Sequence, residues 1–227
     1  LEANPGTLSF EYLLGLKNLG FNRISIGVQS TDPFDLKRLD RIHTLEEVLI
    51  NRNSIRKVGL KNLNMDLIFG LPWQSLDGWK NSLERAIYLQ PEHFSLYSLL
   101  IEEGTKLYKW NQKGLIKTQD QDLEGEMYEC AMTMLDKAGY EHYEISNWAK
   151  RDPIIDYRCR HNLQYWLNMP YLSFGAGAHG YVNGIRMVNT SDIFEYIERI
   201  NQIDPATQSF PLSPATVSSS SVDKLTQ

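Results

Sequence analysis

Four polar side chains lie near the ends of expected strands, in positions suited to chemistry. The central stretch is residues 62–72, NLNMDLIFGLP, whose period-two alternation separates an apolar face from a face that carries Asp66. Glu2, Gln29 and Tyr97 occupy matching positions in three further stretches. Side chains at the carboxyl ends of parallel strands are where α/β barrels keep their chemistry. The sequence therefore predicts that these four residues face one lumen, although each alone is equally consistent with a satisfied polar group in a barrel core.

Alternating strands and helices are expected to position these side chains. Period-two patterns predict strands at 1–5, 21–30, 62–72 and 92–100, and capped patterns of helical period predict helices at 7–19, 44–59 and 75–89. Thr44 and Glu47 have the spacing of a capping box. Each strand and helix together take roughly 30 to 40 residues, which is typical of parallel βαβ units. The first hundred residues therefore predict the later strands of an α/β barrel, in a chain expected to be a fragment.

The pattern changes after residue 105. Helices are predicted at 119–138, around HNLQYW and at 193–200, with one strand at 140–148 and a hairpin turn at Asn183-Gly184. Cys130 falls on the apolar side of the first of these helices and is expected to be a core residue. We therefore expect the barrel part at 1–105, an α+β extension at 106–203, and a Pro-, Ser- and Thr-rich linker to a further domain at 204–227.

Composition excludes several classes of function. The 227 residues carry a formal net charge of −5 and no basic run, which argues against a nucleic-acid-binding surface. No apolar run approaches the ~18 residues of a membrane span. Two cysteines, far apart in the chain, do not suggest the disulfide framework of a secreted protein. The reducing cytoplasm is therefore the expected compartment.

Several motifs, in a fixed order, carry a resemblance to a known family. They are EANP from Glu2, ISIGVQS from Ile24, LDRIH from Leu39, MDLIFGLP from Met65, HFSLYSLLIEEGT from His93 and YEISNWA from Tyr143. This set resembles the radical S-adenosylmethionine proteins of the oxygen-independent coproporphyrinogen III oxidase group. HNLQYW from His161 and GAGAHG from Gly175 resemble a haem-chaperone branch of that family. The likeness covers residues 1 to about 200.

The resemblance implies a fold, a cofactor and residues that bind it. The implied fold is a partial (β/α)6 barrel, of which this chain would hold the later strands. Glu2 resembles the acid that accepts hydrogen bonds from the ribose of S-adenosylmethionine, and Gln29, Arg41 and Asp66 resemble further contacts to that cofactor. A carboxylate accepts from two hydroxyls, and arginine offers a planar fork of donors to a carboxylate. Arg41 is also consistent with a solvated residue before a helix.

The same resemblance implies a [4Fe-4S] cluster that these residues do not hold by themselves. The family binds the cluster through a CxxxCxxC loop, and Cys130 and Cys159 do not have that spacing. We therefore expect the cluster ligands to lie outside this fragment, and no metal ligand is assigned within it.

HNLQYW suggests a haem site. His161, Tyr165 and Trp166 have the spacing of one side of a helix, where an imidazole can ligate haem iron and aromatic rings can pack on the porphyrin. For His161 the preferred interpretation is structural, as a residue that ties the C-terminal part to the barrel edge, with haem ligation as the alternative. For His179 a loop role among glycines is preferred.

Two functions follow from the resemblance. The favoured one is a haem carrier that passes haem to acceptor proteins. The alternative is a radical enzyme that decarboxylates coproporphyrinogen III, with the same residues holding the cofactor. Peripheral membrane association is left open by these patterns.

Overall fold

The structure, a computed structural model, describes residues 1–202 and 213–221. It divides into two compact units, Leu1–Arg158 and Cys159–Gln227. The division falls beyond the boundary expected at residue 105, because the strands that follow residue 105 join the first sheet.

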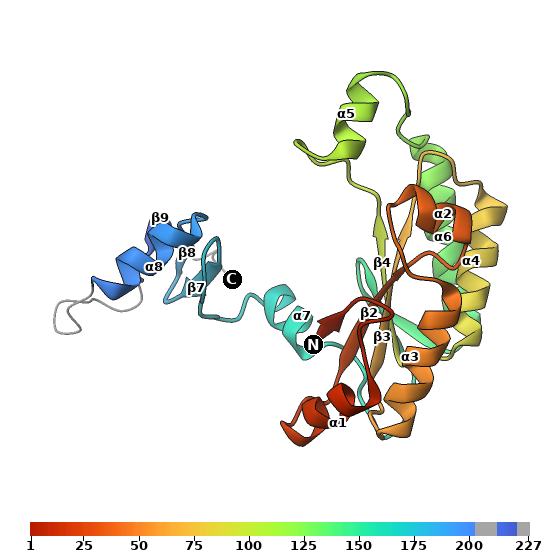
Figure 1. Cartoon of the computed structure of the whole chain (residues 1–227), viewed down its shortest axis with the longest axis horizontal. Helices are drawn as coiled ribbons and strands as arrows, with labels where there is room; N and C mark the ends of the chain where they lie inside the picture. Colours follow the sequence, from red (N-terminus) through yellow and green to blue (C-terminus); the bar gives the residue numbers. More distant parts are fainter. Residues whose placement is uncertain (203–212, 222–227) are drawn as a thin grey trace. The chain divides into compact units, whose positions relative to one another are not determined.

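The first unit is built on a six-stranded sheet of order β1-β2-β3-β4-β6-β5 (Figure 1). The strands β1 to β4 are parallel, and β6 is antiparallel to both of its neighbours, β4 and β5. Their bounds are β1 Glu2–Ala3, β2 Ile24–Gln29, β3 Leu63–Phe69, β4 His93–Ser98, β5 Tyr140–Glu144 and β6 Asn147–Lys150. The parallel strands and their crossover helices confirm the predicted βαβ units.

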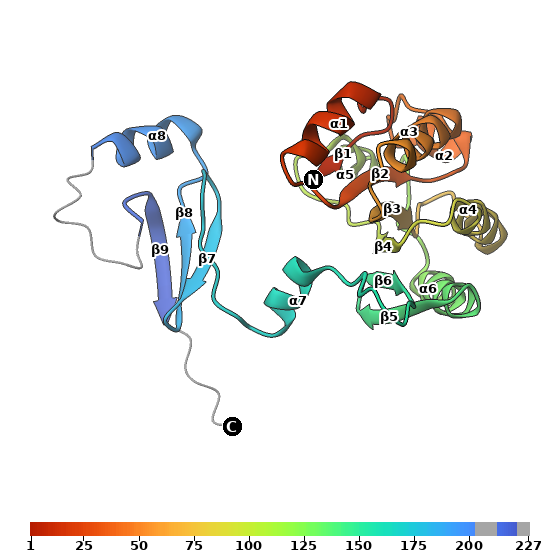
Figure 2. The same ribbon diagram turned by 90° about the horizontal axis from the view of Figure 1, so that it is seen from below.

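Helices cover one face of this sheet. In the two perpendicular views α3, α4 and α6 lie along the same side of the strands (Figures 1 and 2). The helices of the unit are α1 Phe10–Asn18, α2 Pro33–Arg38, α3 Leu45–Lys57, α4 Leu76–Tyr88, α5 Lys106–Gln112 and α6 Gln121–Lys137. Leu63, Met65, Leu67 and Phe69 of β3 belong to the core with these helices, each at most 4% exposed, which confirms the predicted apolar face. Asp66 consequently points to the other face.

Local sequence signals decide where the helices begin. Thr44 and Glu47 form the predicted capping box at the start of α3, with both reciprocal hydrogen bonds present. Asp32 caps α2 with Pro33 at the first position, and Ser75 caps α4. These side chains bind backbone N–H groups that a helix cannot satisfy internally.

The strand predicted at 140–148 is wrong as a single element. The structure breaks it into β5 and β6, an antiparallel hairpin that turns at Ile145 and Ser146. The hairpin satisfies the backbone of both halves, and it buries Tyr140 from one strand and Trp148 from the other. β6 then pairs with β4 and extends the parallel sheet with an antiparallel edge.

The second unit has a three-stranded antiparallel sheet of order β7-β8-β9. Its elements are α7 Arg160–Trp166, β7 His179–Val182, β8 Ile185–Asn189, α8 Ile193–Asn201 and β9 Thr216–Ser221. Asn183 and Gly184 connect β7 and β8 with positive φ angles of 52° and 76°, as the predicted hairpin turn requires.

The expected linker at 204–227 needs a correction where the structure describes it. Thr216–Ser221 forms β9, because its backbone pairs with the free edge of β8. The rest of that range, apart from residues 213–215, lies outside the described residues. Among the helices that the structure describes, none has the length and apolar character needed to cross a membrane.

Candidate functional site

A cavity of about 650 Å³ opens at the carboxyl ends of the parallel strands in the first unit. Its lining includes Glu2 from β1, Gln29 from β2, Asp66 from β3 and Tyr97 from β4. Four strands bring these residues together from positions spread over almost a hundred residues of sequence. The prediction that they share one cavity is confirmed. Their binding of S-adenosylmethionine stays a prediction.

Gln29 reaches this cavity through an unusual backbone conformation. It has a φ angle of 64°, and the pairing of β2 with β3 shifts register between Ile26 and Gln29. A bulge of this kind redirects a side chain at the end of a strand. Gly27 leaves room for the result, because a Cβ atom there would lie 2.8 Å from Gln29 Nε2. A left-handed glutamine held at a cavity is the kind of backbone strain that proteins retain at functional sites.

Asp66 is held by neighbouring donors. Ser25 Oγ donates to Asp66 Oδ2 at 2.9 Å, and Asn64 Nδ2 donates to Asp66 Oδ1 at 2.6 Å. Burial raises the pKa of Asp66, the two hydrogen bonds oppose that rise, and the nearby Glu2 carboxylate adds to it. The site therefore places two carboxylates near each other in a partly dry cavity, an arrangement that attracts a cationic ligand.

A buried network beneath Asp66 was not singled out from the sequence. His93 Nδ1 hydrogen-bonds Asn64 Oδ1, and His93 Nε2 lies 2.7 Å from the Tyr143 hydroxyl. His93 is fully buried, and this burial, with a contribution from the charge of Arg23, lowers its pKa to about 2. The imidazole is consequently neutral. The sequence did offer one signal for this network. His93 lies on the same strand face as Tyr97, because both alternate with the apolar residues of β4.

Arg41 lies outside this cavity. Its Nη1 donates to Asn4 Oδ1 at 3.3 Å, and its side chain lines a neighbouring cavity with Leu36 and His43. Asn4 follows directly after β1, and its Oδ1 lies near Gly27, at 3.7 Å from the position of an added Cβ. Arg41 is thus connected to the strand ends through Asn4.

The candidate haem residues lie on α7 of the second unit. The rings of His161 and Tyr165 meet edge to face with centroids 4.9 Å apart, and Tyr165 makes a similar contact with Tyr171 at 4.6 Å. Trp166 is 55% exposed, and His161 is exposed as well. His179 begins β7 and is also exposed. The helix predicted around HNLQYW is confirmed, and its imidazole is accessible to a ligand.

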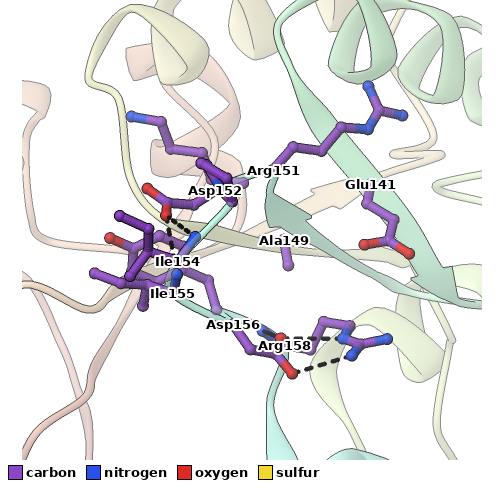
Figure 3. A pocket seen from close by; sticks show the side chains of 11 residues that line it. Glu141, Ala149, Arg151, Asp152, Ile154, Ile155, Asp156 and Arg158 are labelled. Carbon is purple, nitrogen blue, oxygen red and sulfur yellow. Dashed lines mark hydrogen bonds and ion pairs between the residues drawn. The ribbon is translucent and has the colours of Figure 1, made fainter.

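A polar cavity of about 550 Å³ is formed mainly by residues 149–158 (Figure 3). Asp152 accepts from the backbone N–H groups of Ile154 and Ile155, each at 2.9 Å, and Asp156 pairs with Arg158 at 3.0 Å. Asp152, Asp156 and Arg158 thus have their hydrogen-bond partners within the loop itself, which fixes the shape of this cavity.

Within residues 1–202 and 213–221, no three His, Cys, Asp or Glu side chains lie close enough together to hold a metal ion. Burial raises the pKa of the Cys130 thiol.

Comparisons with known proteins agree with the arrangement of the first unit. Residues 1–86 match the Radical SAM superfamily model. The chain is 42% identical over 200 residues to the heme chaperone HemW of Bacillus subtilis, covering 88% of this chain and 52% of that protein. It is 41% identical over 182 residues to HemW of Escherichia coli, covering 80% and 46%. The chain thus spans about half the length of these curated relatives.

A solved structure is similar to this chain in fold. The coproporphyrinogen III oxidase HemN of Escherichia coli, described as a radical SAM enzyme, superposes with a TM-score of 0.71 over 88% of this chain and 48% of that one. At 19% identity this likeness concerns the fold alone. Residues 1–86, which include the strands that carry Glu2, Gln29 and Asp66, thus form a radical SAM domain, and over most of its length the chain is similar to the HemW proteins.

Proposed function

We propose that the complete protein is a haem chaperone that binds S-adenosylmethionine and a [4Fe-4S] cluster, carries haem and passes it to acceptor proteins. The observation that carries the proposal is the convergence of Glu2, Gln29 and Asp66 on one cavity in a chain whose relatives are named heme chaperones. The radical SAM domain of residues 1–86 implies the cofactor and the cluster.

The chemistry of the cavity fits S-adenosylmethionine. This cofactor carries two cationic groups, a sulfonium and an ammonium, and the carboxylates of Glu2 and Asp66 complement their charge. Glu2 would accept hydrogen bonds from the ribose hydroxyls, and the Gln29 amide would donate and accept beside it. Arg41 would act from the neighbouring cavity, with Asn4 between it and the strand ends.

The cluster, when bound, would anchor the amino and carboxylate groups of the cofactor. Its ligands are proposed to lie outside residues 1–227, since Cys130 and Cys159 do not form a three-thiolate set. The residues of this chain would hold and orient the remainder of the cofactor.

Haem is proposed to bind at α7. His161 presents an exposed imidazole, the side chain that most often ligates haem iron, and its ring already contacts Tyr165. Tyr165 and the half-exposed Trp166 offer aromatic surface on which a porphyrin could stack.

The test uses the full-length protein with its cluster intact. A chaperone should bind haem and leave coproporphyrinogen III unchanged in the presence of S-adenosylmethionine and a reductant. His161→Ala should shift the Soret band and weaken haem binding, because loss of an axial imidazole changes the ligand field of the iron. His179→Ala is the matched control, since it removes another exposed imidazole of the same unit.

The outcomes separate the candidate functions. Steady decarboxylation of coproporphyrinogen III would refute the chaperone and favour the enzyme. A Soret band that changes in His179→Ala and stays constant in His161→Ala would move the ligand to His179. Asp66→Asn should weaken S-adenosylmethionine binding and leave the haem spectrum unchanged. Asp77→Asn, at an exposed carboxylate on α4, should change neither S-adenosylmethionine binding nor the haem spectrum.

A further inference from the structure

A second cavity, of about 800 Å³, lies in the first unit among the segments that follow β2, β3 and β4. It shares no lining residue with the cavity of Asp66. Its walls combine three aromatic rings with three cations, namely Phe34, Trp73, Trp110, Lys37, Arg38 and Lys106. One carboxylate, Asp40, also lines it. The cavity is therefore both aromatic and cationic.

Arg38 is held in this cavity by aromatic rings. Its guanidinium lies 4.1 Å from the centre of the Phe34 ring and 5.0 Å from that of Trp73. Within the described part of the chain, Arg38 has no hydrogen bond to an acceptor and no ion pair. A guanidinium has five donors in a planar fork that matches a carboxylate. Its position is fixed by the rings while those donors stay available.

Trp73 is itself fixed in orientation. Its Nε1 donates to Asp35 Oδ1 at 2.8 Å, and Asp35 is a buried carboxylate that also accepts from Ser30 Oγ at 2.9 Å. The indole is therefore a wall that exists before any ligand arrives. Preorganised walls of this kind reduce the entropy cost of binding.

Lys106 gives the opposite side of the cavity a second cation. Its Nζ lies 5.1 Å from the centre of the Trp110 ring and 3.6 Å from Asp40 Oδ2. The pair with Asp40 is exposed, with 65% and 85% of the two side chains accessible, so it contributes little energy. Lys106 can exchange Asp40 for an anionic ligand at small cost.

We propose that this cavity is a binding site for a planar aromatic ligand that carries carboxylate groups, with Arg38 pairing with a carboxylate and Trp73 and Trp110 contacting the ring. The proposal extends the proposed function, because haem belongs to this class of ligand. His161 is not among the residues that line this cavity. Binding in the cavity would depend on the carboxylates and the ring of the ligand, and it would need no bond to iron.

Metal-free protoporphyrin IX is the probe, because it lacks the iron that an imidazole would ligate. The full-length protein is titrated with it, and binding is followed by porphyrin fluorescence and by quenching of tryptophan emission. Arg38→Met keeps an aliphatic stem over the two rings and removes the guanidinium. We expect the Kd to rise about tenfold, the lower end of the loss for a hydrogen bond to a charged group. Lys106→Met should raise the Kd in the same direction.

Two controls isolate the cause. Lys57→Met removes a cation that also lies over a ring, 5.2 Å from the centre of Phe10, but outside this cavity, and it should leave the Kd unchanged. Protoporphyrin IX dimethyl ester, which has no carboxylates, should bind the wild type about tenfold more weakly and should not distinguish Arg38→Met from it.

Wild-type affinity in both Arg38→Met and Lys106→Met would overturn the proposal, and so would equal binding of the acid and the ester. Loss of protoporphyrin IX binding in His161→Ala would also overturn it, because the porphyrin would then bind at α7. If haem shows no axial ligation by His161 while Arg38→Met still weakens protoporphyrin IX binding, the proposed haem site at α7 is refuted and the proposed site in this cavity is supported.

Discussion

The buried imidazole of His93 should make the first unit lose stability in mild acid, and His93→Gln should remove that loss. His93 is fully buried and neutral between Asn64 and Tyr143, and its pKa is lowered to about 2. In the unfolded chain the same imidazole has its ordinary pKa of 6.5. Below pH 6.5 the imidazole of His93 is therefore protonated in the unfolded state but remains neutral in the folded state. The free energy of unfolding falls as the pH decreases from 6.5 towards 2.

The size of the effect follows from this difference in pKa. Each pH unit below 6.5 should cost about 1.4 kcal/mol, so the loss between neutral pH and pH 4.5 is about 2.7 kcal/mol. Asp66 has the opposite effect on the pH dependence of stability. Its pKa is raised in the folded state, so the folded state binds a proton more readily than the unfolded state does. For this reason the wild type and His93→Gln are also compared in an Asp66→Asn background.

Urea unfolding at about pH 7.0, 5.5 and 4.5 measures the difference in the free energy of unfolding, with one pH above the ordinary histidine pKa and two below it. Trp79 and Trp148 are fully buried in the first unit, so tryptophan emission reports its unfolding. The free energies of the two proteins should converge as the pH falls, with unchanged m-values. Parallel pH profiles would refute the reasoning, since His93 would then titrate alike in the folded and unfolded states.

Three further predictions test other parts of the structure. Thr44→Ala removes the capping box of α3 and should lower the free energy of unfolding by about 1 kcal/mol in urea unfolding. Leu83→Ala leaves a cavity beneath α4 and should cost about 2–5 kcal/mol, whereas Tyr88→Ala, at a side chain 83% exposed on the same helix, should stay within about 0.5 kcal/mol. Gly27→Ala should displace the Gln29 amide and lower the affinity of the full-length protein for S-adenosylmethionine in calorimetry, and unchanged affinity would remove Gln29 from the site.

The order and type of most elements could be predicted from the sequence, because each depends on residues close to one another in the chain. Alternation over seven residues predicts β3 and its buried face, and it also predicts that Asp66 points away from the helices. The capping box of α3 involves positions only three residues apart. The hairpin at Asn183-Gly184 needs only two residues that tolerate positive φ.

Where the pattern was ambiguous, local sequence failed. Residues 140–148 alternate well enough for one strand, and only the antiparallel pairing of β5 with β6 shows that the chain turns back at Ile145 and Ser146. The hydrogen bond from Arg41 to Asn4 is likewise absent from any local pattern, and the contact of Arg41 with the cofactor stays a prediction. Strand pairing and side-chain reach are properties of the folded sheet, so no local pattern contains them.

The sequence by itself determined the strands, the helix caps and the identity of the polar residues at the strand ends. The tertiary structure alone decided which of them meet. His93 contacts Asn64, 29 residues away in the sequence, and Tyr143, 50 residues away, and Arg38 at the end of α2 contacts Trp73 in the loop that follows β3. The physical reason is that a local pattern sets backbone conformation over a few residues. The burial and pairing of distant polar groups arise only when the sheet assembles and excludes water from between its strands.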